Sequence, residues 1–527
     1  MNQPRSLLRT VGSISSATSL SRVLGLVRDQ VQSYYFGAGS MTDAFLAAFR
    51  IPNLLRDLFA EGAMSSAFVP TFTAERERHG ADAAWRLANR LITALILILS
   101  AVTLGIFVGA PWILRIYVPG FEPEKMELAV SMTRILSPFL LFVALAAVAM
   151  GVLNTCGRFF LPALAPASFN VAAILGVVIL VPILPRLGVE PVLALPIGAI
   201  TGGALQFLVQ VPAMRREGFR FRLELALRDP ALRRIGWLMV PATLGLAATQ
   251  INILVDTMLA SRFGDGPITY LTIAFRLMQL PIGVFGVAIA TANLTRVSRD
   301  AARGDHAAML ANLAAAVRMA SVLALPAMFG LIALRAPIVR MLFEHGQFNP
   351  EDTARTAGAV LCYSLGLFAY AVSKIQVPTF YALGDTRTPV WGSVTSVAAK
   401  IAANFLFIAV FRRLGFDPFL GLAVATSLAA WINFSWLSIG LRRRLGPMRE
   451  HGVASTCLKM LLLSALMGTV VAWVHGGLVR TIGGGGLPGE IGRLGVAIAS
   501  GVLFLVVGLR LMNLPEARAL RWPGRKR

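Results

Sequence analysis

Long, almost uncharged apolar stretches constrain this sequence more than any other feature. A helix needs about 20 mostly apolar residues to cross a bilayer, and a window of about 19 residues finds such segments. The sequence holds fourteen of them, at residues 10–33, 42–70, 84–110, 128–154, 162–183, 192–213, 235–260, 268–294, 307–334, 354–381, 389–411, 419–440, 453–474 and 493–512. The first two are unusually polar. The pattern predicts an all-α integral membrane protein with about fourteen transmembrane helices.

Composition supports the same fold class. Only 14% of the 527 residues are charged and the mean hydropathy is +0.70, whereas soluble domains carry about 25% charged residues. The three cysteines show no CxxC spacing, so a disulfide scaffold or a cysteine-based zinc site is excluded. No cleavable signal peptide is recognisable at the N-terminus. An ordinary soluble multidomain enzyme is therefore excluded.

The net charge of +23 has a membrane explanation. In a soluble protein such a balance would suggest a nucleic-acid partner. Here much of the excess lies in short loops, where Lys and Arg face the headgroups of membrane lipids, so no nucleic-acid partner is expected. With a cytoplasmic N-terminus the inner loops carry 18 Lys and Arg, and the outer loops carry 9. The positive-inside rule then places both termini in the cytoplasm.

An internal repeat with a fixed offset of 227 residues divides the chain. Asp29 matches Asp256, Gly157 matches Gly384, and the run at residues 186–191 matches residues 413–418. Each repeat holds six helices, so both halves enter the membrane in the same orientation, and we expect an axis along the membrane normal with a central cavity. The predicted domains are an N-terminal lobe (1–225), a C-terminal lobe (226–445), and an appended helix pair with a basic tail (446–527).

Charged residues inside the predicted helices are the strongest candidates for function. A charge at the centre of a spanning helix costs at least ~2.5 to 3.5 kcal/mol, so such a helix must line water or protein. The first two helices carry most of them: Arg22, Arg28, Asp29, Asp43, Arg50, Arg56, Asp57 and Glu61. The second lobe has fewer: Asp256, Arg276, Lys374 and Lys400. The N-terminal lobe is therefore expected to supply most of the binding charge.

Each of these charges has a structural alternative. Arg22 and Asp29 lie seven residues apart on one helix face, so an ion pair between them stays open beside a role in binding. Arg56 and Glu61 are five residues apart, an awkward spacing for a pair, which favours Arg56 as a free charge in the cavity. Arg276 has no acidic residue within a turn, which favours a functional role.

Arginine in a cavity indicates an anionic cargo. Its guanidinium offers a fixed fork of donors that binds phosphate oxygens two at a time and keeps its proton. The sequence holds no phosphate loop, nucleophile elbow or paired histidine ligands, so nothing indicates covalent chemistry. The motif RLMQLPIGVFGVAIAT adds Pro281 and Gly283 within a spanning helix, where a kink or hinge for alternating access is predicted.

The motifs SRVLGLVRD, FGAGSMTDAF, NLLRDLFAEGAMSSAFVP, RLMQLPIGVFGVAIAT and FYALGDTRTP resemble those of the MurJ (MviN) family. The resemblance covers nearly the whole chain. It implies a lipid II flippase of the multidrug/oligosaccharidyl-lipid/polysaccharide exporter superfamily, which moves lipid II across the bacterial cytoplasmic (inner) membrane for peptidoglycan synthesis. By motif position it also implies essential cavity arginines at Arg28, Arg56 and Arg276. Arg22, Asp43 and Glu61 match further important positions.

The same resemblance raises questions about a coupling ion. Some family members bind sodium through residues that match Asp256, Asn404 and Thr426, but Ile408 stands where they carry an acid. Some also carry an acid just before the arginine that matches Arg276, where this chain has Phe275. No cofactor is expected beyond a possible sodium or other coupling ion. We expect a monomer whose possible partners are the cell-wall synthesis machinery.

Three other functions remain as alternatives. A flippase for another polyprenyl-linked oligosaccharide would need the same cavity arginines, because its lipid also carries a pyrophosphate. A multidrug exporter of the same superfamily usually ejects cations, which a basic cavity disfavours. A membrane-embedded glycosyltransferase would need catalytic acids in a large outer loop, and the outer loops here are short.

Overall fold

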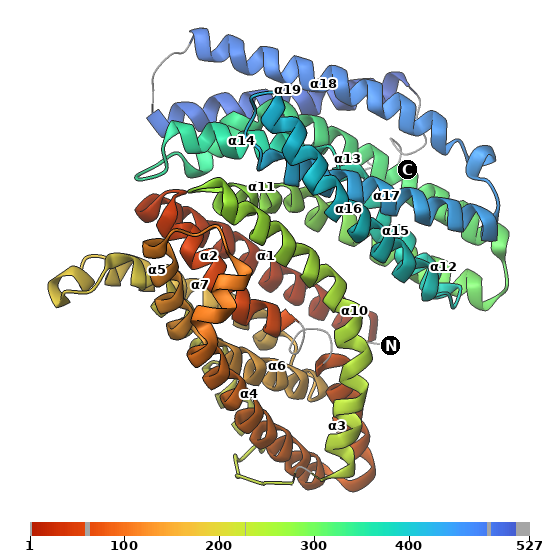
Figure 1. Ribbon diagram of the computed structural model, residues 1–527. Helices are drawn as coiled ribbons and strands as arrows, with labels where there is room; N and C mark the ends of the chain where they lie inside the picture. The colour runs from red at the N-terminus through yellow and green to blue at the C-terminus, as the bar shows by residue number, and fades with distance from the viewer. Residues whose placement is uncertain (1–2, 58–63, 227, 482–485, 513–527) are drawn as a thin grey trace. The chain divides into compact units, whose positions relative to one another are not determined.

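The computed structural model describes residues 3–57, 64–226, 228–481 and 486–512 (Figure 1). Those residues form helices and connecting turns, and the part of the chain they cover contains no β-strand. By their contacts they divide into two units. Unit 1 holds Met1–Thr269 with His345–Phe348, and unit 2 holds Tyr270–Glu344 with Asn349–Arg527.

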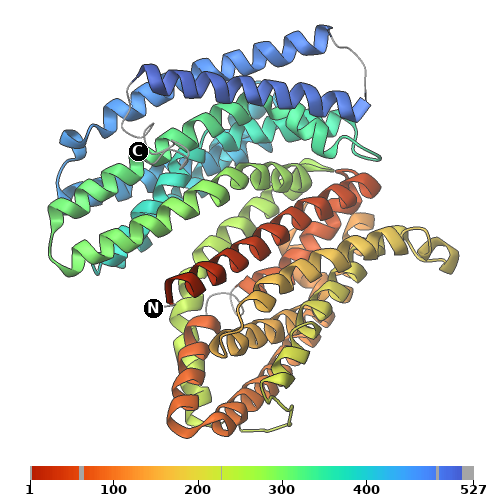
Figure 2. The same cartoon turned by 180° about the vertical axis from the view of Figure 1, so that it is seen from behind.

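Ten helices lie in unit 1. They are α1 (Gln3–Phe36), α2 (Ser40–Arg56), α3 (Met64–His79), α4 (Ala81–Tyr117), α5 (Pro123–Leu136), α6 (Phe139–Thr155), α7 (Phe160–Leu180), α8 (Ala194–Leu208), α9 (Val211–Arg216) and α10 (Pro230–Ala260). In Figure 2 the red helix α1 can be followed beside α7, with which it packs. Helices α7 and α8 cross closely, because a Cβ on Gly176 would lie 2.6 Å from the Cα of Gly198. Such small-residue crossings are typical of membrane helices.

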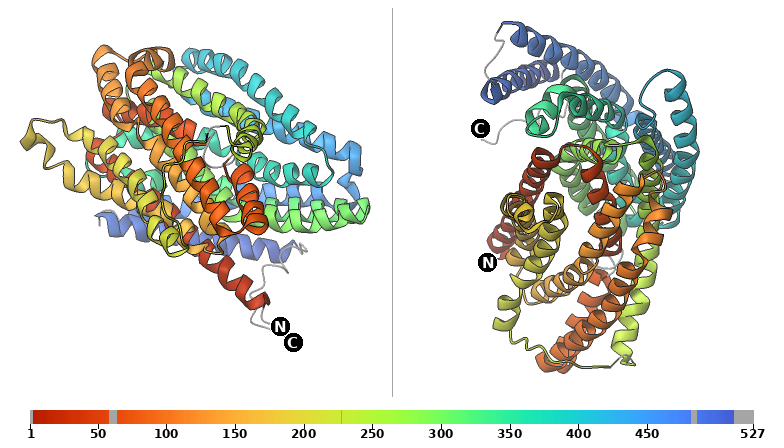
Figure 3. Two further views of the ribbon diagram at one scale, coloured as in Figure 1. Left: turned by 90° about the horizontal axis from the view of Figure 1, so that it is seen from below. Right: turned by 60° about the vertical axis from the view of Figure 1, so that its left-hand side comes forward.

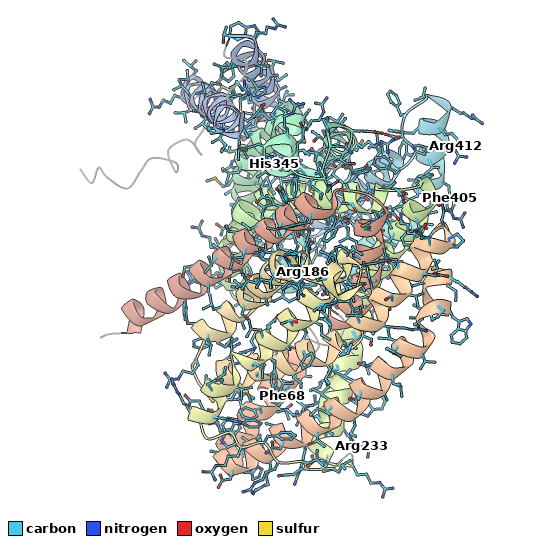
Figure 4. All side chains as sticks on the ribbon, turned by 90° about the vertical axis from the view of Figure 1, so that its left-hand side faces the viewer. Phe68, Arg186, Arg233, His345, Phe405 and Arg412 are labelled. Atoms are coloured by element: carbon cyan, nitrogen blue, oxygen red, sulfur yellow. The ribbon has the colours of Figure 1, made fainter. Side chains whose placement is uncertain are left out.

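The core of unit 1 gathers large side chains from α3, α4, α6 and α10. Phe68 and Phe72 of α3 are fully buried there beside Leu87 of α4 and Ile235 of α10. Figure 4 labels Phe68 among these helices and Arg233 near the start of α10. Helix α10, which the repeat assigns to the second lobe, therefore packs with the helices of the first.

The segment that leads into α10 is fixed to α4 by side chains of α4. The amide of Asn89 donates to the backbone oxygen of Arg220 (3.0 Å) and accepts from the backbone nitrogen of Arg222 (3.1 Å). Arg90 pairs with Glu224 at 3.3 Å and also with Asp229, the N-cap of α10. This linker therefore has a defined path although it forms no regular secondary structure.

Unit 2 holds the remaining helices. They are α11 (Pro267–Pro281, from Tyr270 onward), α12 (Val287–Ala302), α13 (His306–Phe343), α14 (Pro350–Ser364), α15 (Leu367–Ala382), α16 (Arg387–Arg413), α17 (Leu420–Leu445), α18 (Val453–Thr481) and α19 (Gly486–Leu511). The blue helices α18 and α19 lie side by side in Figure 3, and both contact α13. The predicted appended pair is thus packed on the long helix α13 through Leu334, Met467 and Ala497.

The segments predicted to span the membrane lie on helices, with short breaks, wherever the structure describes them; residues 58–63 of the second segment lie outside the described residues. Among the described residues, nine helices are long and apolar enough to cross a bilayer, or ten if α14 and α15, bent by 45°, form one span. Helices α1 and α2 are not among them, because the polar residues of α1 lower its hydropathy and α2 is only 17 residues long. The all-α membrane fold is confirmed, whereas fourteen crossings remain a prediction.

The repeat extends from sequence to helix boundaries. Pro123 and Pro350, 227 residues apart, begin the broken helix pairs α5–α6 and α14–α15. Gly157 and Gly384, at the same offset, both adopt left-handed backbone angles (φ 76° and 72°) that favour glycine. The residues that follow them form matching ion pairs of opposite polarity. Arg158 pairs with Glu217 at 2.8 Å, and Asp385 pairs with Arg444 at 2.6 Å.

Candidate functional site

Arg28 is held in position by its neighbours on α1 and α7. Its Nη2 lies 3.0 Å from Oδ1 of Asp29, and its Nη1 donates to Oδ1 of Asn170 at 3.1 Å. Nδ2 of Asn170 in turn donates to the backbone oxygen of Ser21 at 3.0 Å, and the guanidinium lies 5.5 Å from the ring centre of Phe169. Asn170 therefore fixes the direction of Arg28 relative to helix α1.

A second group of polar side chains joins α2 to α10. Nη2 of Arg56 lies 2.8 Å from Oδ1 of Asp57, and Oδ2 of Asp57 accepts from Nε2 of Gln250 at 3.1 Å. Oε1 of Gln250 accepts from Nη2 of Arg50 at 2.9 Å. Gln250 thus links two arginines of α2 through one amide and one carboxylate, and no spacing within a single helix indicates this link.

These contacts correct two predictions about pairing. Arg56 is not a free cavity charge in this conformation, because α2 ends at Arg56 and the next residue, Asp57, turns its carboxylate to the guanidinium. Asp29 pairs with Arg28, its neighbour in sequence, rather than with Arg22, whose side chain is exposed. Glu61 lies outside the described residues.

Unit 1 remains cationic despite these pairs. The side chains of Arg28 and Arg56 retain exposed fractions of 15% and 26%. Arginine carries five N–H donors; at Arg28 the Asp29 carboxylate accepts from Nε and Nη2, and Asn170 accepts one hydrogen bond from Nη1. The arrangement therefore has the charge and the donors to bind an anion.

Asp43 occupies a different, closed environment. Its carboxylate is fully buried and accepts from the backbone nitrogens of Gly266 (2.8 Å) and Thr269 (2.9 Å) and from the Thr269 hydroxyl (2.7 Å). Nζ of Lys125 lies 3.1 Å from the same carboxylate and 2.8 Å from Oδ1 of Asp265. Asp43 therefore ties the start of α11 to α2 and α5. Lys125, which no sequence motif singles out, supplies the counter-charge.

Unit 2 contains Arg276 on α11, half-buried in the described structure. The preceding residue, Phe275, packs edge-on against Tyr363 with ring centres 5.3 Å apart, and lies 6.4 Å from the Tyr370 ring. Phe275 thus fills an aromatic position, and residue 275 brings no carboxylate beside Arg276.

The predicted hinge coincides with a change in helix type. Helix α11 ends at Pro281 and is followed by a π-helical segment, Ile282–Gly286, before α12 begins. Proline removes a backbone donor, and π-helical turns are often found at functional sites. Pro281 and Gly283 therefore lie at an irregular point of the helix, and their action as a hinge stays a prediction.

The residues matched to a sodium site supply few oxygen ligands. In unit 2, Asn404 and Thr426 are buried, Thr426 donates its hydroxyl to the Leu422 carbonyl, and Ile408 offers no oxygen. Lys400, one turn before Asn404 on the same buried face of α16, brings a positive charge instead. Asp256 belongs to unit 1. A bound sodium ion therefore stays a prediction from the resemblance.

Comparison with known proteins places these features in a family. Residues 32–482 match the family model described as lipid II flippase MurJ. The chain is 35% identical over 532 residues to the probable lipid II flippase MurJ of Vibrio cholerae, covering 97% of this chain and 98% of the relative. It is 36% identical over 447 residues to the lipid II flippase MurJ of Burkholderia cenocepacia, covering 83% and 84% of the two chains.

Solved structures agree with this assignment. A lipid II flippase MurJ in an inward closed conformation superposes with a TM-score of 0.77 at 28% identity, covering 95% of this chain and 99% of that one. An inward-facing multidrug resistance MATE transporter of the MOP superfamily reaches a TM-score of 0.67 at 16% identity over 83% of this chain and 98% of its own, and this likeness concerns the fold alone. Because the family model matches residues 32–482, which is most of this chain, the chain belongs to the lipid II flippase MurJ family.

Proposed function

We propose that this protein moves lipid II, the undecaprenyl-pyrophosphate-linked peptidoglycan precursor, from the inner to the outer leaflet of the cytoplasmic membrane. Membership of the MurJ family carries this proposal. The paired arginines of unit 1 support it, because a lipid pyrophosphate needs cationic groups inside a membrane protein. A flippase moves its substrate without breaking a covalent bond, so the protein acts as a transporter and not as an enzyme.

In this proposal Arg28 and Arg56 bind the pyrophosphate, and Arg276 contributes a further charge during the cycle. Arg22 adds positive charge near the entry to this region, while Asp43 positions the start of α11. The aspartates beside Arg28 and Arg56 orient the guanidiniums before substrate arrives. Orientation in advance lowers the entropy lost when the pyrophosphate binds.

Membrane potential supplies a driving force for alternating access. An inside-negative potential favours outward movement of an anion by about 2.3 kcal/mol per charge per 100 mV. The same field favours the return of an empty, positively charged protein. In this cycle sodium has no required role.

The orientation, the oligomeric state and the partners of the protein belong to the same proposal. The excess of Lys and Arg in the inner loops supports a cytoplasmic location of both termini. One chain contains both arginine-bearing units, so a monomer suffices for transport, and the released lipid II is then used by the cell-wall synthesis machinery.

Lipid II exposed at the outer leaflet is the decisive measurement. Cells depleted of their own flippase would express the parent chain, Arg28→Ala, Arg276→Ala or the control Arg412→Ala at equal levels. Arg412 stands near the end of α16 and is exposed (Figure 4). We expect exposure of lipid II with the parent and the control, and loss with the other two variants.

Two outcomes would contradict the proposal in different ways. A well-expressed parent that exposes no lipid II would reject lipid II as the cargo and point to another polyprenyl-linked oligosaccharide. Full transport by Arg28→Ala and Arg276→Ala would keep the cargo and reject the arginines as its binding groups.

A further inference from the structure

Gln250 is a buried amide with hydrogen bonds to two side chains of another helix. It lies on α10, within the predicted spanning segment 235–260, and is 8% exposed. Its Oε1 accepts from Nη2 of Arg50 at 2.9 Å, and its Nε2 donates to Oδ2 of Asp57 at 3.1 Å. Polar side chains are costly inside a membrane protein unless they bind one another, and they often serve function. The proposed transport cycle gives no role to Gln250 or to Arg50.

The chemistry of its two neighbours fixes the direction of the Gln250 amide. A guanidinium can only donate hydrogen bonds, and an ionised carboxylate can only accept them. The amide oxygen must therefore face Arg50 and the amide nitrogen must face Asp57, which is the arrangement observed. A reversed amide would place a donor against Arg50 and an acceptor against Asp57. Gln250 thus holds the Asp57 carboxylate in one orientation.

The Asp57 carboxylate in turn holds Arg56. Its Oδ1 accepts from Nη2 of Arg56 at 2.8 Å and from Nε at 3.2 Å, while its Oδ2 accepts from Gln250. Arg56 is the last residue of α2, and a long arginine side chain has many rotamers to choose from. The hydrogen bonds that run from Arg50 through Gln250 and Asp57 restrict this freedom.

The same arrangement occurs at the other candidate arginine of unit 1. Arg28 and Arg56 each precede an aspartate, and in both pairs Oδ1 of that aspartate accepts from Nε and Nη2 of the arginine. An amide from a distant helix completes each group: Asn170 of α7 binds Arg28, and Gln250 of α10 binds Asp57. Repetition at the two arginines of unit 1 proposed to bind the pyrophosphate favours a shared role over a chance contact between helices.

We propose that Gln250 is a positioning residue for substrate binding. Through Asp57 it sets the direction in which Arg56 presents its guanidinium to the pyrophosphate, and Arg50 acts by fixing the Gln250 amide. This inference rests on the proposed function, because it gives Gln250 a part in binding lipid II. Orientation in advance reduces the entropy lost on binding, so loss of the amide weakens binding even when the charge of the group stays the same.

Binding of lipid II to the purified chain, measured by native mass spectrometry, tests this role. Gln250→Leu is similar in volume and removes both hydrogen bonds without changing the net charge. Gln210→Leu is the matched control, since Gln210 is also a buried glutamine of unit 1, but its Nε2 donates to the backbone oxygens of Ala146 and Gln206. We expect about tenfold weaker binding for Gln250→Leu, the size of one hydrogen bond to a charged group, and unchanged binding for the control.

An exchange of acid and amide distinguishes positioning from packing. Gln250→Glu places a second carboxylate against Asp57, so binding should fall at least as far as in Gln250→Leu. Adding Asp57→Asn should restore most of the lost affinity, because the new amide at position 57 can donate to the new carboxylate at position 250, which still accepts from Arg50. The double variant and Gln250→Leu both keep the net charge of the parent. Tighter binding by the double variant than by Gln250→Leu therefore comes from the hydrogen bonds and not from charge.

Thermal unfolding separates positioning from stability. Gln250→Leu and Gln210→Leu both remove buried hydrogen bonds, and each should lower the Tm. A purely structural role would make binding follow the Tm, so both variants would then lose affinity. If Gln250→Leu fails to fold, Gln250→Asn takes its place, because the shorter amide keeps the polarity but cannot reach both partners.

Two results would overturn this inference and leave the proposed function intact. Equal lipid II binding by the parent and by Gln250→Leu would show that Gln250 does not position Arg56. A double variant that binds no better than Gln250→Leu would show that the hydrogen bonds between these two positions do not contribute to binding. A parent that binds no lipid II would instead reject the proposed function, and this inference with it.

Discussion

Removal of the Asp43 carboxylate offers a quantitative test of the network around the start of α11. In Asp43→Ala, four donors lose their acceptor: Nζ of Lys125, the backbone nitrogens of Gly266 and Thr269, and the Thr269 hydroxyl. Both members of the ion pair are buried, with exposed side-chain fractions of 5% and 1%. Breaking a buried pair from one side typically costs about 3–5 kcal/mol.

A remaining partner moderates this cost. Lys125 keeps Asp265 at 2.8 Å, but that carboxylate is 61% exposed, and an exposed pair contributes only about 0–1 kcal/mol. We therefore expect Asp43→Ala to lower the free energy of unfolding by about 3 kcal/mol. Lys125→Met alone should cost less, because Asp43 retains its three donors near the start of α11.

The assay is a double-mutant cycle read by thermal unfolding of the purified protein. When both Asp43 and Lys125 are replaced, no unpaired buried charge remains, so the double variant should be more stable than the sum of the single effects predicts. We expect a coupling of at least about 1 kcal/mol. Strictly additive effects would refute the reasoning, because they would mean that the two side chains do not stabilise one another.

Three other outcomes are expected. Asn170→Leu should reduce lipid II exposure at unchanged expression, since Arg28 loses its anchor, whereas normal transport would show that Asn170 does not position Arg28. Hydrogen bonds from Thr388 and the nearby Arg444 hold the pKa of the Asp385 carboxyl below its usual range. The ionised Asp385 carboxylate therefore stabilises the folded protein fully above the ordinary carboxyl pKa of about 4. This stabilisation disappears as the pH falls through the lowered pKa of Asp385. Asp385→Asn should thus lower the Tm at neutral pH and not in strong acid, and an equal deficit at both would contradict the assignment. Replacing sodium by potassium in a transport assay should leave lipid II movement unchanged, because Lys400 already brings a cation to the buried face of α16; a loss of transport would show that sodium is required.

The sequence predicts the helices well because their signals are local. Apolar length marks most segments, and a fixed offset of 227 residues exposes the repeat. Even α1 and α2, whose charges lower their hydropathy, were expected as helices that line protein or water. The helix boundaries at Pro123 and Pro350 then follow from proline at the first turn.

The pairing of charges could not be predicted in the same way. Spacing rules apply within a regular helix. Because Arg56 lies where α2 ends, these rules do not predict its ion pair with Asp57. Gln250 and Asn170 come from helices far away in the chain, and an amide gives no charge signal in the sequence. Lys125 gives no functional signal in the sequence, because it lies in a predicted outer loop, where a lysine is common.

The two repeats carry an ion pair at equivalent positions, with acid and base exchanged, and this exchange limits which single substitutions keep the contact. Arg158 with Glu217 and Asp385 with Arg444 are equivalent pairs whose acid and base have changed places. Any route from one arrangement to the other by single substitutions passes through two like charges, or through a neutral residue that breaks the contact. A chimera that transplants only one member of a pair would bring two bases or two acids together.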